Sequence, residues 1–131
     1  MVIDVGTWVD GYARAWVEMD AEAAAALFSE DAKYRSFIFD EPHVGRAGVR
    51  DYWSEVTSTQ SDVQVRMGRP IVEGRRAAVE FWTNMQNEGS EVTLVGCLLL
   101  IFDDAGLCQS LDEYYEFAPG RMDPPEPWGA L

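Results

Sequence analysis

The sequence predicts an α+β fold in which about three N-terminal helices pack on a curved antiparallel sheet. Two observations lead to this prediction. In three segments between residues 4 and 56, helix-forming or apolar residues recur with the three- and four-residue spacing of helices. From residue 62 to residue 117 the apolar spacing changes to two, which is typical of strands. Helices followed by a run of antiparallel strands indicate the α+β class.

The helical part begins at the N-terminus. The first helix is predicted over Asp4–Met19, with Asp4 or Thr7 as its N-cap. A short Ala-rich helix over Ala21–Phe28 follows a cap at Asp20. The apolar faces hold Trp8, Tyr12, Ala15, Trp16 and Met19 in the first helix, and Val49, Tyr52, Trp53 and Val56 in a third helix that Gly45-Arg46-Ala47-Gly48 introduces.

The strands follow in a simple order. The first is predicted over Ala32–Phe39, and a second begins at Asp62, bends at residues 68–70 and resumes at 71–72. The bend is expected because Pro70 cannot donate a hydrogen bond in a ladder. Residues 75–117 then form three long strands joined by two turns, Asn87-Glu88-Gly89-Ser90 and Asp103-Asp104-Ala105-Gly106.

Charge and composition exclude several classes of partner. The chain has 131 residues and a net charge of −13, which opposes binding to nucleic acid and to an anionic membrane surface. No apolar run approaches the roughly 18 residues of a membrane span, and the N-terminus lacks the pattern of a signal peptide. We therefore expect a cytoplasmic protein without nucleic-acid or membrane partners.

Cofactor and metal chemistry find no support in the sequence. A symmetric second hairpin places Cys97 opposite Asp112 and Cys108 opposite Ile101, so the two sulfurs are about 13 Å apart and should stay reduced. With those separated thiols and a single histidine, His43, no metal site is expected. No Gly-rich phosphate loop follows a strand, so no nucleotide cofactor is expected either.

Several short sequences mark the ends of these elements: Trp16 before Asp20, Leu27-Phe28 before Asp31-Ala32, Gly45-Arg46 with Val49 and Tyr52-Trp53, and Phe102-Asp103 with Gly106-Leu107 and Glu113-Tyr114. In this order they resemble the nuclear transport factor 2-like superfamily, in its SnoaL-like branch, over nearly the whole chain. The resemblance implies a cone-shaped fold whose strongly bent sheet wraps the helices, with ligands entering the open end. The fold hosts isomerases, cyclases, epoxide hydrolases, dehydratases and non-catalytic binders, so it specifies no single function.

The resemblance can be followed residue by residue into three enzyme branches. Of the ketosteroid isomerase set, Tyr12 matches the tyrosine, whereas Ser36 and Leu98 stand where two aspartates are needed. The limonene epoxide hydrolase set falls on Glu80, Trp82 and Glu113, of which only Glu113 keeps an acid where the branch has one. In the polyketide cyclase branch an acid on the late strands matters, and Glu113 is the position that matches. Neither the ketosteroid isomerase set nor the limonene epoxide hydrolase set is complete.

The carried-over positions predict a site for a small, mostly apolar molecule. Glu80, Trp82 and Glu113 are expected to face the interior of the cone, with Tyr12, Trp16, Tyr34, Trp53 and Leu98 completing its lining. Two carboxyl groups in a dry pocket cannot both ionise cheaply, so Glu80 and Glu113 are expected to act as acid and base, with Tyr12 as hydrogen-bond donor. Alternatively, both glutamates hydrogen-bond Tyr12, Tyr34 or a nearby arginine and only stabilise the core.

The sequence also predicts the domain limits and the assembly of the protein. Residues 1–117 form one domain, and the Pro-rich tail 118–131 should pack on it through Trp128. The outer face of the sheet is expected to mediate a homodimer, because it would expose the apolar residues Val79, Phe81, Val95, Cys97, Leu99 and Ile101. A non-catalytic binder or a dimeric interaction module remains the alternative to an enzyme.

Overall fold

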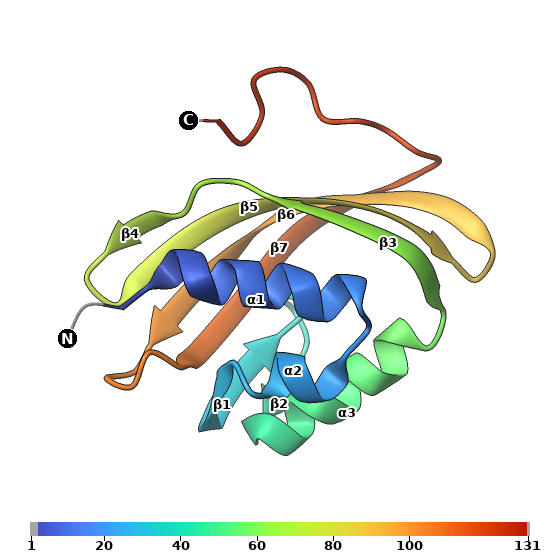
Figure 1. The fold of residues 1–131 in the computed structure, drawn as a ribbon. Helices are drawn as coiled ribbons and strands as arrows, with labels where there is room; N and C mark the ends of the chain where they lie inside the picture. The colour runs from blue at the N-terminus through green and yellow to red at the C-terminus, as the bar shows by residue number, and fades with distance from the viewer. Residues whose placement is uncertain (1–2, 131) are drawn as a thin grey trace.

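Three helices lie on one face of a curved sheet in the computed structural model, which describes residues 3–130 (Figure 1). The helices are α1 (Val5–Val17), α2 (Ala21–Ala25) and α3 (Gly45–Thr57). The strands are β1 (Phe28–Arg35), β2 (His43–Val44), β3 (Gln60–Met67), β4 (Ile71–Glu73), β5 (Arg76–Asn87), β6 (Ser90–Phe102) and β7 (Cys108–Pro119). The predicted α+β fold with helices on a bent sheet is confirmed.

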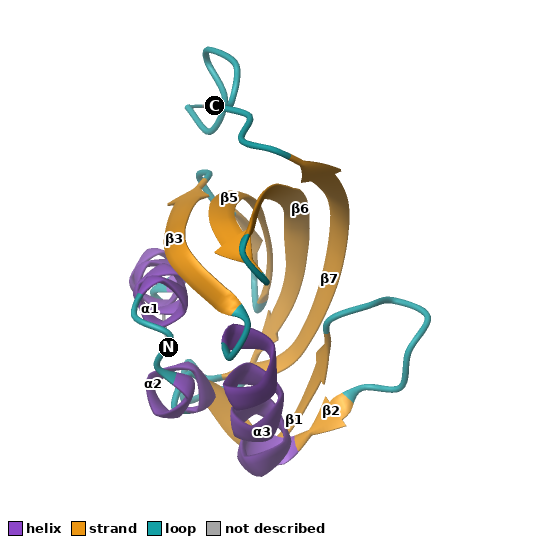
Figure 2. Cartoon of the chain, turned by 90° about the vertical axis from the view of Figure 1, so that its right-hand side faces the viewer, coloured by secondary structure: helices purple, strands orange, loops and turns teal. Residues whose placement is uncertain are grey.

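The sheet is mixed rather than purely antiparallel. Its order is β2-β1-β7-β6-β5-β3, with β4 paired to β5. Hairpins join β5, β6 and β7, so these strands alternate in direction, whereas β1 runs parallel to β7 beside it. Figure 2 shows β3, β5, β6 and β7 curving over the helices. Apolar periodicity predicts strands but not the direction of their partners, which is why the parallel pair was not foreseen.

The two predicted turns are present, with one change of register. Glu88 and Gly89 have φ values of 52° and 83°, as a two-residue hairpin turn requires, so β5 and β6 pair without slippage. In the second hairpin Cys97 lies opposite Tyr114 rather than Asp112, and Cys108 lies opposite Phe102 rather than Ile101. The turn offsets the symmetric pairing by one residue, and a register shift between Ile101 and Phe102 adds another. Both cysteines are free thiols, as predicted.

Helix α1 begins where the sequence predicts and ends earlier. The Asp4 carboxylate accepts the backbone N–H of Thr7 at 3.0 Å and caps the helix. The helix ends at Val17, so Met19, with φ of 54° and 42% exposed, lies beyond it and outside the core. The second helix is likewise shorter than predicted, because Phe28 begins β1.

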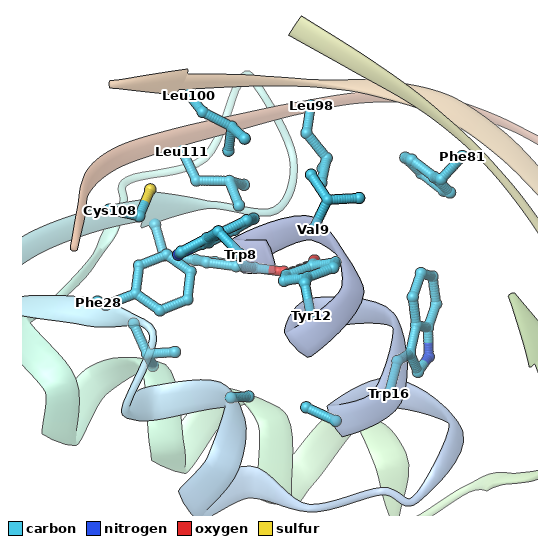
Figure 3. Packing of buried hydrophobic residues seen from close by; sticks show 14 of the residues in the cluster. Trp8, Val9, Tyr12, Trp16, Phe28, Phe81, Leu98, Leu100, Cys108 and Leu111 are labelled. Carbon is cyan, nitrogen blue, oxygen red and sulfur yellow. Dashed lines mark hydrogen bonds between the residues drawn. The ribbon is translucent and has the colours of Figure 1, made fainter. Parts of the chain in front are cut away.

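An aromatic core joins α1 to the sheet. Figure 3 shows the side chains of Trp8, Tyr12 and Trp16 along α1, with Trp8 beside Phe28 and Trp16 pointing toward Phe81. Ring contacts fix their positions, since Trp8 and Tyr12 stack at 5.3 Å between centroids. The buried indole N–H of Trp8 donates to the Leu27 carbonyl at 2.8 Å, so its polar end is satisfied.

Gly96 allows β6 and β7 to approach closely. A Cβ at this position would collide with the Tyr114 carbonyl oxygen and lie 2.8 Å from the Tyr115 Cβ. Gly96 pairs with Tyr115 on β7, so the missing side chain makes room for the neighbouring strand rather than for a ligand.

The C-terminal segment after β7 lies over the outer face of the sheet, opposite the helices (Figure 1). Trp128 packs edge-on against Trp82 with 5.8 Å between ring centroids, and the Arg66 guanidinium lies 5.5 Å from its ring. The Trp82 indole N–H donates to the Met122 carbonyl at 2.8 Å. Strand β7 continues past residue 117 to Pro119. The domain limit at residue 117 stays a prediction. Within residues 3–130, no helix is long and apolar enough to cross a membrane.

Candidate functional site

A cavity of about 350 Å³ lies between the helices and the inner face of the sheet. Its size is at the lower end of the range for small-molecule sites. Most of its walls are aromatic or aliphatic, and a single carboxyl group reaches it. The lining residues are Tyr12, Trp16, Tyr34, Ser36, Tyr52, Trp53, Val56, Gln60, Met85, Asn87, Leu94, Glu113, Tyr115 and Phe117.

Glu113 is the carboxyl group of the cavity. It lies on β7 opposite Leu98 of β6, and its side chain is 7% exposed. Burial removes the carboxylate from water and raises the pKa of Glu113 from 4.5 to about 8, while the Tyr34 hydroxyl acts in the opposite direction. None of the lining residues is a lysine, arginine or histidine that would favour the ionised form. Glu113 is therefore mainly a neutral acid at pH 7.

Two tyrosine hydroxyls form a buried pair in the same cavity. The hydroxyls of Tyr12 from α1 and Tyr34 from β1 lie 3.1 Å apart and are hydrogen-bonded. Burial raises the pKa of each tyrosine well above 10.0, and the nearby Glu113 adds to the effect. Burial also raises the pKa of Tyr52 to about 12. All three phenols are neutral near pH 7 and keep their protons for hydrogen bonds.

Two tryptophans form the adjoining wall. The rings of Trp16 and Trp53 meet edge to face with 6.0 Å between centroids. The Trp16 indole N–H donates to the Gln60 side chain at 2.9 Å. The buried Trp53 indole N–H has no hydrogen-bond partner within residues 3–130. A buried donor without a partner is costly, so a bound molecule with an acceptor near Trp53 would remove that cost.

The structure assembles only part of the predicted site. Tyr12, Trp16, Tyr34, Trp53 and Glu113 all line the cavity. Leu98 is 1% exposed and packs in the core but does not line the cavity.

The expectation that Glu80 and Trp82 face the interior is wrong. Glu80 is exposed and lies opposite Cys97, and Trp82 contacts the C-terminal segment on the outer face. Successive strand residues point to opposite faces, so the neighbours of Glu80 in β5, Val79 and Phe81, are the buried ones. These two residues were expected on the outer face, and that too is wrong. The predicted pair of carboxyl groups is therefore not formed.

Sequence reasoning missed Gln60 and Asn87, which line the cavity at the ends of β3 and β5. The two residues lie directly opposite each other in the β3–β5 ladder. Nothing local marks either residue, because their juxtaposition depends on a pairing shift between Ser61 and Gln64. Across residues 3–130, no group of three or more His, Cys, Asp or Glu side chains is arranged to hold a metal ion.

The family comparison agrees with the fold. The family model of the SnoaL-like domain matches residues 9–109, which is more than half of the chain. No curated protein sequence matches the chain.

Solved structures of the same fold are similar at low sequence identity. A hypothetical protein with a ketosteroid isomerase-like fold from Catenulispora acidiphila DSM 44928, in complex with trimethylamine, is 19% identical with a TM-score of 0.75, covering 82% of this chain and 84% of that one. The epoxide hydrolase/cyclase-like enzyme SalBIII, of pyran ring formation in salinomycin, is 20% identical with a TM-score of 0.74, covering 85% and 89%. An epoxide hydrolase from M. tuberculosis, of the LEH-like type, is 15% identical with a TM-score of 0.70, covering 84% and 80%. At these identities the likeness concerns the fold.

Proposed function

We propose that this chain, which belongs to the SnoaL-like domain family, binds a small, mostly apolar molecule in the inner cavity and exchanges a proton with it through Glu113. The observation that carries the proposal is the buried Glu113 carboxyl, with a pKa raised to about 8, in a cavity of aromatic walls. A general acid works best when its pKa lies near the working pH. Glu113 meets this condition at neutral pH.

The tyrosine pair has a defined part in this chemistry. Tyr34 is hydrogen-bonded both to Tyr12 and to Glu113. When neutral Glu113 donates to Tyr34 and Tyr34 donates to Tyr12, the Tyr12 hydroxyl proton stays available to an oxygen atom of the ligand. Such a neutral donor stabilises the negative charge that develops on the ligand when the ionised form of Glu113 accepts a proton from carbon or oxygen. When Glu113 instead protonates the ligand, the same hydroxyl orients the oxygen that receives the proton.

The structural relatives are consistent with small molecules of this kind. The relative from Catenulispora acidiphila holds trimethylamine, and SalBIII takes part in pyran ring formation. Both relatives share the fold at about one-fifth identity or less, so they support the class of ligand and not its identity.

Native mass spectrometry of the purified protein is the first test of the proposal. We expect a bound compound of small mass, or one that exchanges into the cavity when candidate apolar ketones, epoxides and hydroxy compounds are added. The matched variants are Glu113→Gln in the cavity and Glu80→Gln on the outer face of the same sheet. Turnover lost in Glu113→Gln, with ligand affinity kept and with Glu80→Gln active, supports acid–base catalysis.

The same variants separate the enzyme from a non-catalytic binder. If neither variant changes the fate of a bound molecule, the cavity is a binding site and Glu113 only a polar contact. If Glu113→Gln changes the melting temperature alone and no ligand enters, the proposed small-molecule function is wrong.

The outer face of the sheet supports a proposed homodimer. Leu99 and Ile101 on β6 are 43% and 40% exposed, and Tyr114 on β7 is 46% exposed. These neighbouring apolar side chains lose contact with water when a second copy covers them. A light-scattering mass of twice 14.7 kDa is expected, and the mass of one chain at micromolar concentration would refute the dimer.

We also propose a cytoplasmic location, which fractionation of the producing cells would test.

A further inference from the structure

We infer that the inner cavity takes a neutral, elongated ligand whose far end carries a carbonyl oxygen, which accepts hydrogen bonds from the side-chain amides of Gln60 and Asn87. This inference rests on the proposed function, because it names the class of molecule that binds in the same cavity. It concerns the end of the cavity away from Glu113.

The two amides are placed to contact one ligand atom. Gln60 at the start of β3 and Asn87 at the end of β5 lie opposite each other, and both line the cavity. Side chains directly opposite in an antiparallel pair have Cβ atoms about 5 Å apart. Both side chains are half-buried, so they are held between the cavity and solvent.

Protein donors occupy the carbonyl oxygens of both amides. The Trp16 indole N–H lies 2.9 Å from Gln60 Oε1, and an indole nitrogen can only donate. The Gln60 oxygen must therefore face Trp16, which turns the Nε2 amino group away from it. The Thr59 hydroxyl donates to Asn87 Oδ1 at 2.8 Å, which leaves the Asn87 amino group on the other side of that amide. Neither amino group donates a hydrogen bond to another residue within 3–130, so each amino group has an N–H free for an acceptor on the ligand.

The amides and Glu113 lie toward different ends of the cavity. Glu113 is level with Leu98 on β6 and with Val79 on β5, whereas Asn87 follows Val79 by eight positions at the hairpin end of β5. On the helix side, Tyr12 belongs to the Glu113 end and Trp16 holds Gln60. Tyr12 and Trp16 are one helical turn apart, about 6 Å along α1. A ligand that reaches both ends is therefore elongated, with an apolar middle against Trp16, Trp53 and Leu94.

The acceptor is a neutral carbonyl rather than a carboxylate. None of the lining residues carries a positive charge, and the whole chain has a net charge of −13. A buried anion without a cationic partner is costly, whereas an ester, ketone or amide oxygen needs only the two N–H donors. The ligand class is therefore an apolar molecule with an oxygen function at the Glu113 end and a neutral carbonyl at the other.

Two probes of similar length test the inference. Methyl 3-(4-hydroxyphenyl)propanoate carries a hydroxyl at one end and an ester carbonyl at the other, and 4-pentylphenol lacks the carbonyl. The affinities of both probes are measured by NMR titration on wild type, Gln60→Glu and Gln109→Glu. The Gln60→Glu side chain can still accept from Trp16, but it replaces the free amino group with an oxygen that repels the ester. Gln109 is exposed on β7 outside the cavity lining, so its variant controls for the added charge.

The decisive quantity is the ratio of ester to alkylphenol affinity. The loss of one hydrogen bond costs about 1 kcal/mol, and a repelling oxygen in place of the donor adds to that cost. We therefore expect the ratio of ester to alkylphenol affinity to fall at least fivefold in Gln60→Glu. The ratio should stay unchanged in Gln109→Glu. A ratio in Gln60→Glu within twofold of wild type, with both probes bound, overturns the inference and leaves the proposed cavity function standing. Failure of both probes to bind wild type counts against the cavity function, and the inference falls with it.

Discussion

Replacing Glu113 with glutamine should change how the stability of the protein depends on pH. In the folded protein burial raises the pKa of Glu113 to about 8, whereas in the unfolded chain it returns to near 4.5. Below pH 4.5 the group is protonated in both states and has no effect on this dependence. Between the two values the unfolded chain loses the proton while the folded protein keeps it, so stability falls as pH rises.

The magnitude follows from the two pKa values. Each pH unit in that window costs about 1.4 kcal/mol, so the full effect of Glu113 is roughly 4–5 kcal/mol by pH 8 and levels off above it. Glutamine has nearly the same shape and does not ionise. The difference in unfolding free energy between wild type and Glu113→Gln should therefore move steadily in favour of the variant from pH 5 to pH 8.

Urea unfolding of the ligand-free proteins, followed by tryptophan fluorescence at pH 5, 6, 7, 8 and 9, measures this difference. Comparing the two proteins at each pH cancels the titration of the other acidic groups. Glu80→Gln serves as the matched control for the chemical change, because Glu80 is exposed on the outer face of the same sheet. A difference between wild type and Glu113→Gln that stays within about 0.5 kcal/mol over this range would show that Glu113 is ionised in the folded protein, and the proposed acid role would fail.

Three further predictions concern the frame around the cavity. Gly96→Ala should cost about 2 kcal/mol or more, because its Cβ meets the backbone of β7, whereas Gly6→Ala in α1 should be neutral or stabilising by up to about 1 kcal/mol; thermal unfolding distinguishes them. Trp128→Ala should expose the chain after Arg121 to trypsin several times faster than wild type, since Trp128 loses its contacts with the body; equal cleavage rates would contradict this. Leu99→Lys should convert the proposed dimer to single chains in light scattering, and an unchanged dimer mass would move the interface elsewhere.

Much of the fold was predictable because local signals agreed with one another. Asp4 caps α1, the Glu88-Gly89 turn sets the β5–β6 register, and the break at residues 68–70 separates β3 from β4. Each of these follows from the chemistry of a few adjacent residues. The parallel pairing of β1 with β7 and the register of the second hairpin depend on contacts between distant segments, and no local pattern encodes them.

The site was predictable only for side chains on one face of a helix, or on a strand whose inward-pointing residues are known. Tyr12 and Trp16 follow from the periodicity of α1, and both line the cavity. Glu80 was misplaced because its position came from a family correspondence counted from the last strand, although the two-residue turn pairs it with Cys97. Applied to both hairpins, the same turn geometry would have put Glu80 and Glu113 on opposite faces.

The outward position of Glu80 also limits the chemistry that the cavity favours. Hydrolysis needs a base to activate water in addition to an acid for the leaving oxygen, and Glu113 is the one carboxyl group among the lining residues, which include no histidine. A single carboxyl group can give a proton to one atom of a ligand and later take a proton from another. That sequence returns the carboxyl group to its starting protonation state in an isomerisation or a ring closure, in which the ligand loses and gains the same number of protons. One buried acid with its tyrosine pair therefore favours proton shuttling within one apolar molecule over the addition of water to it.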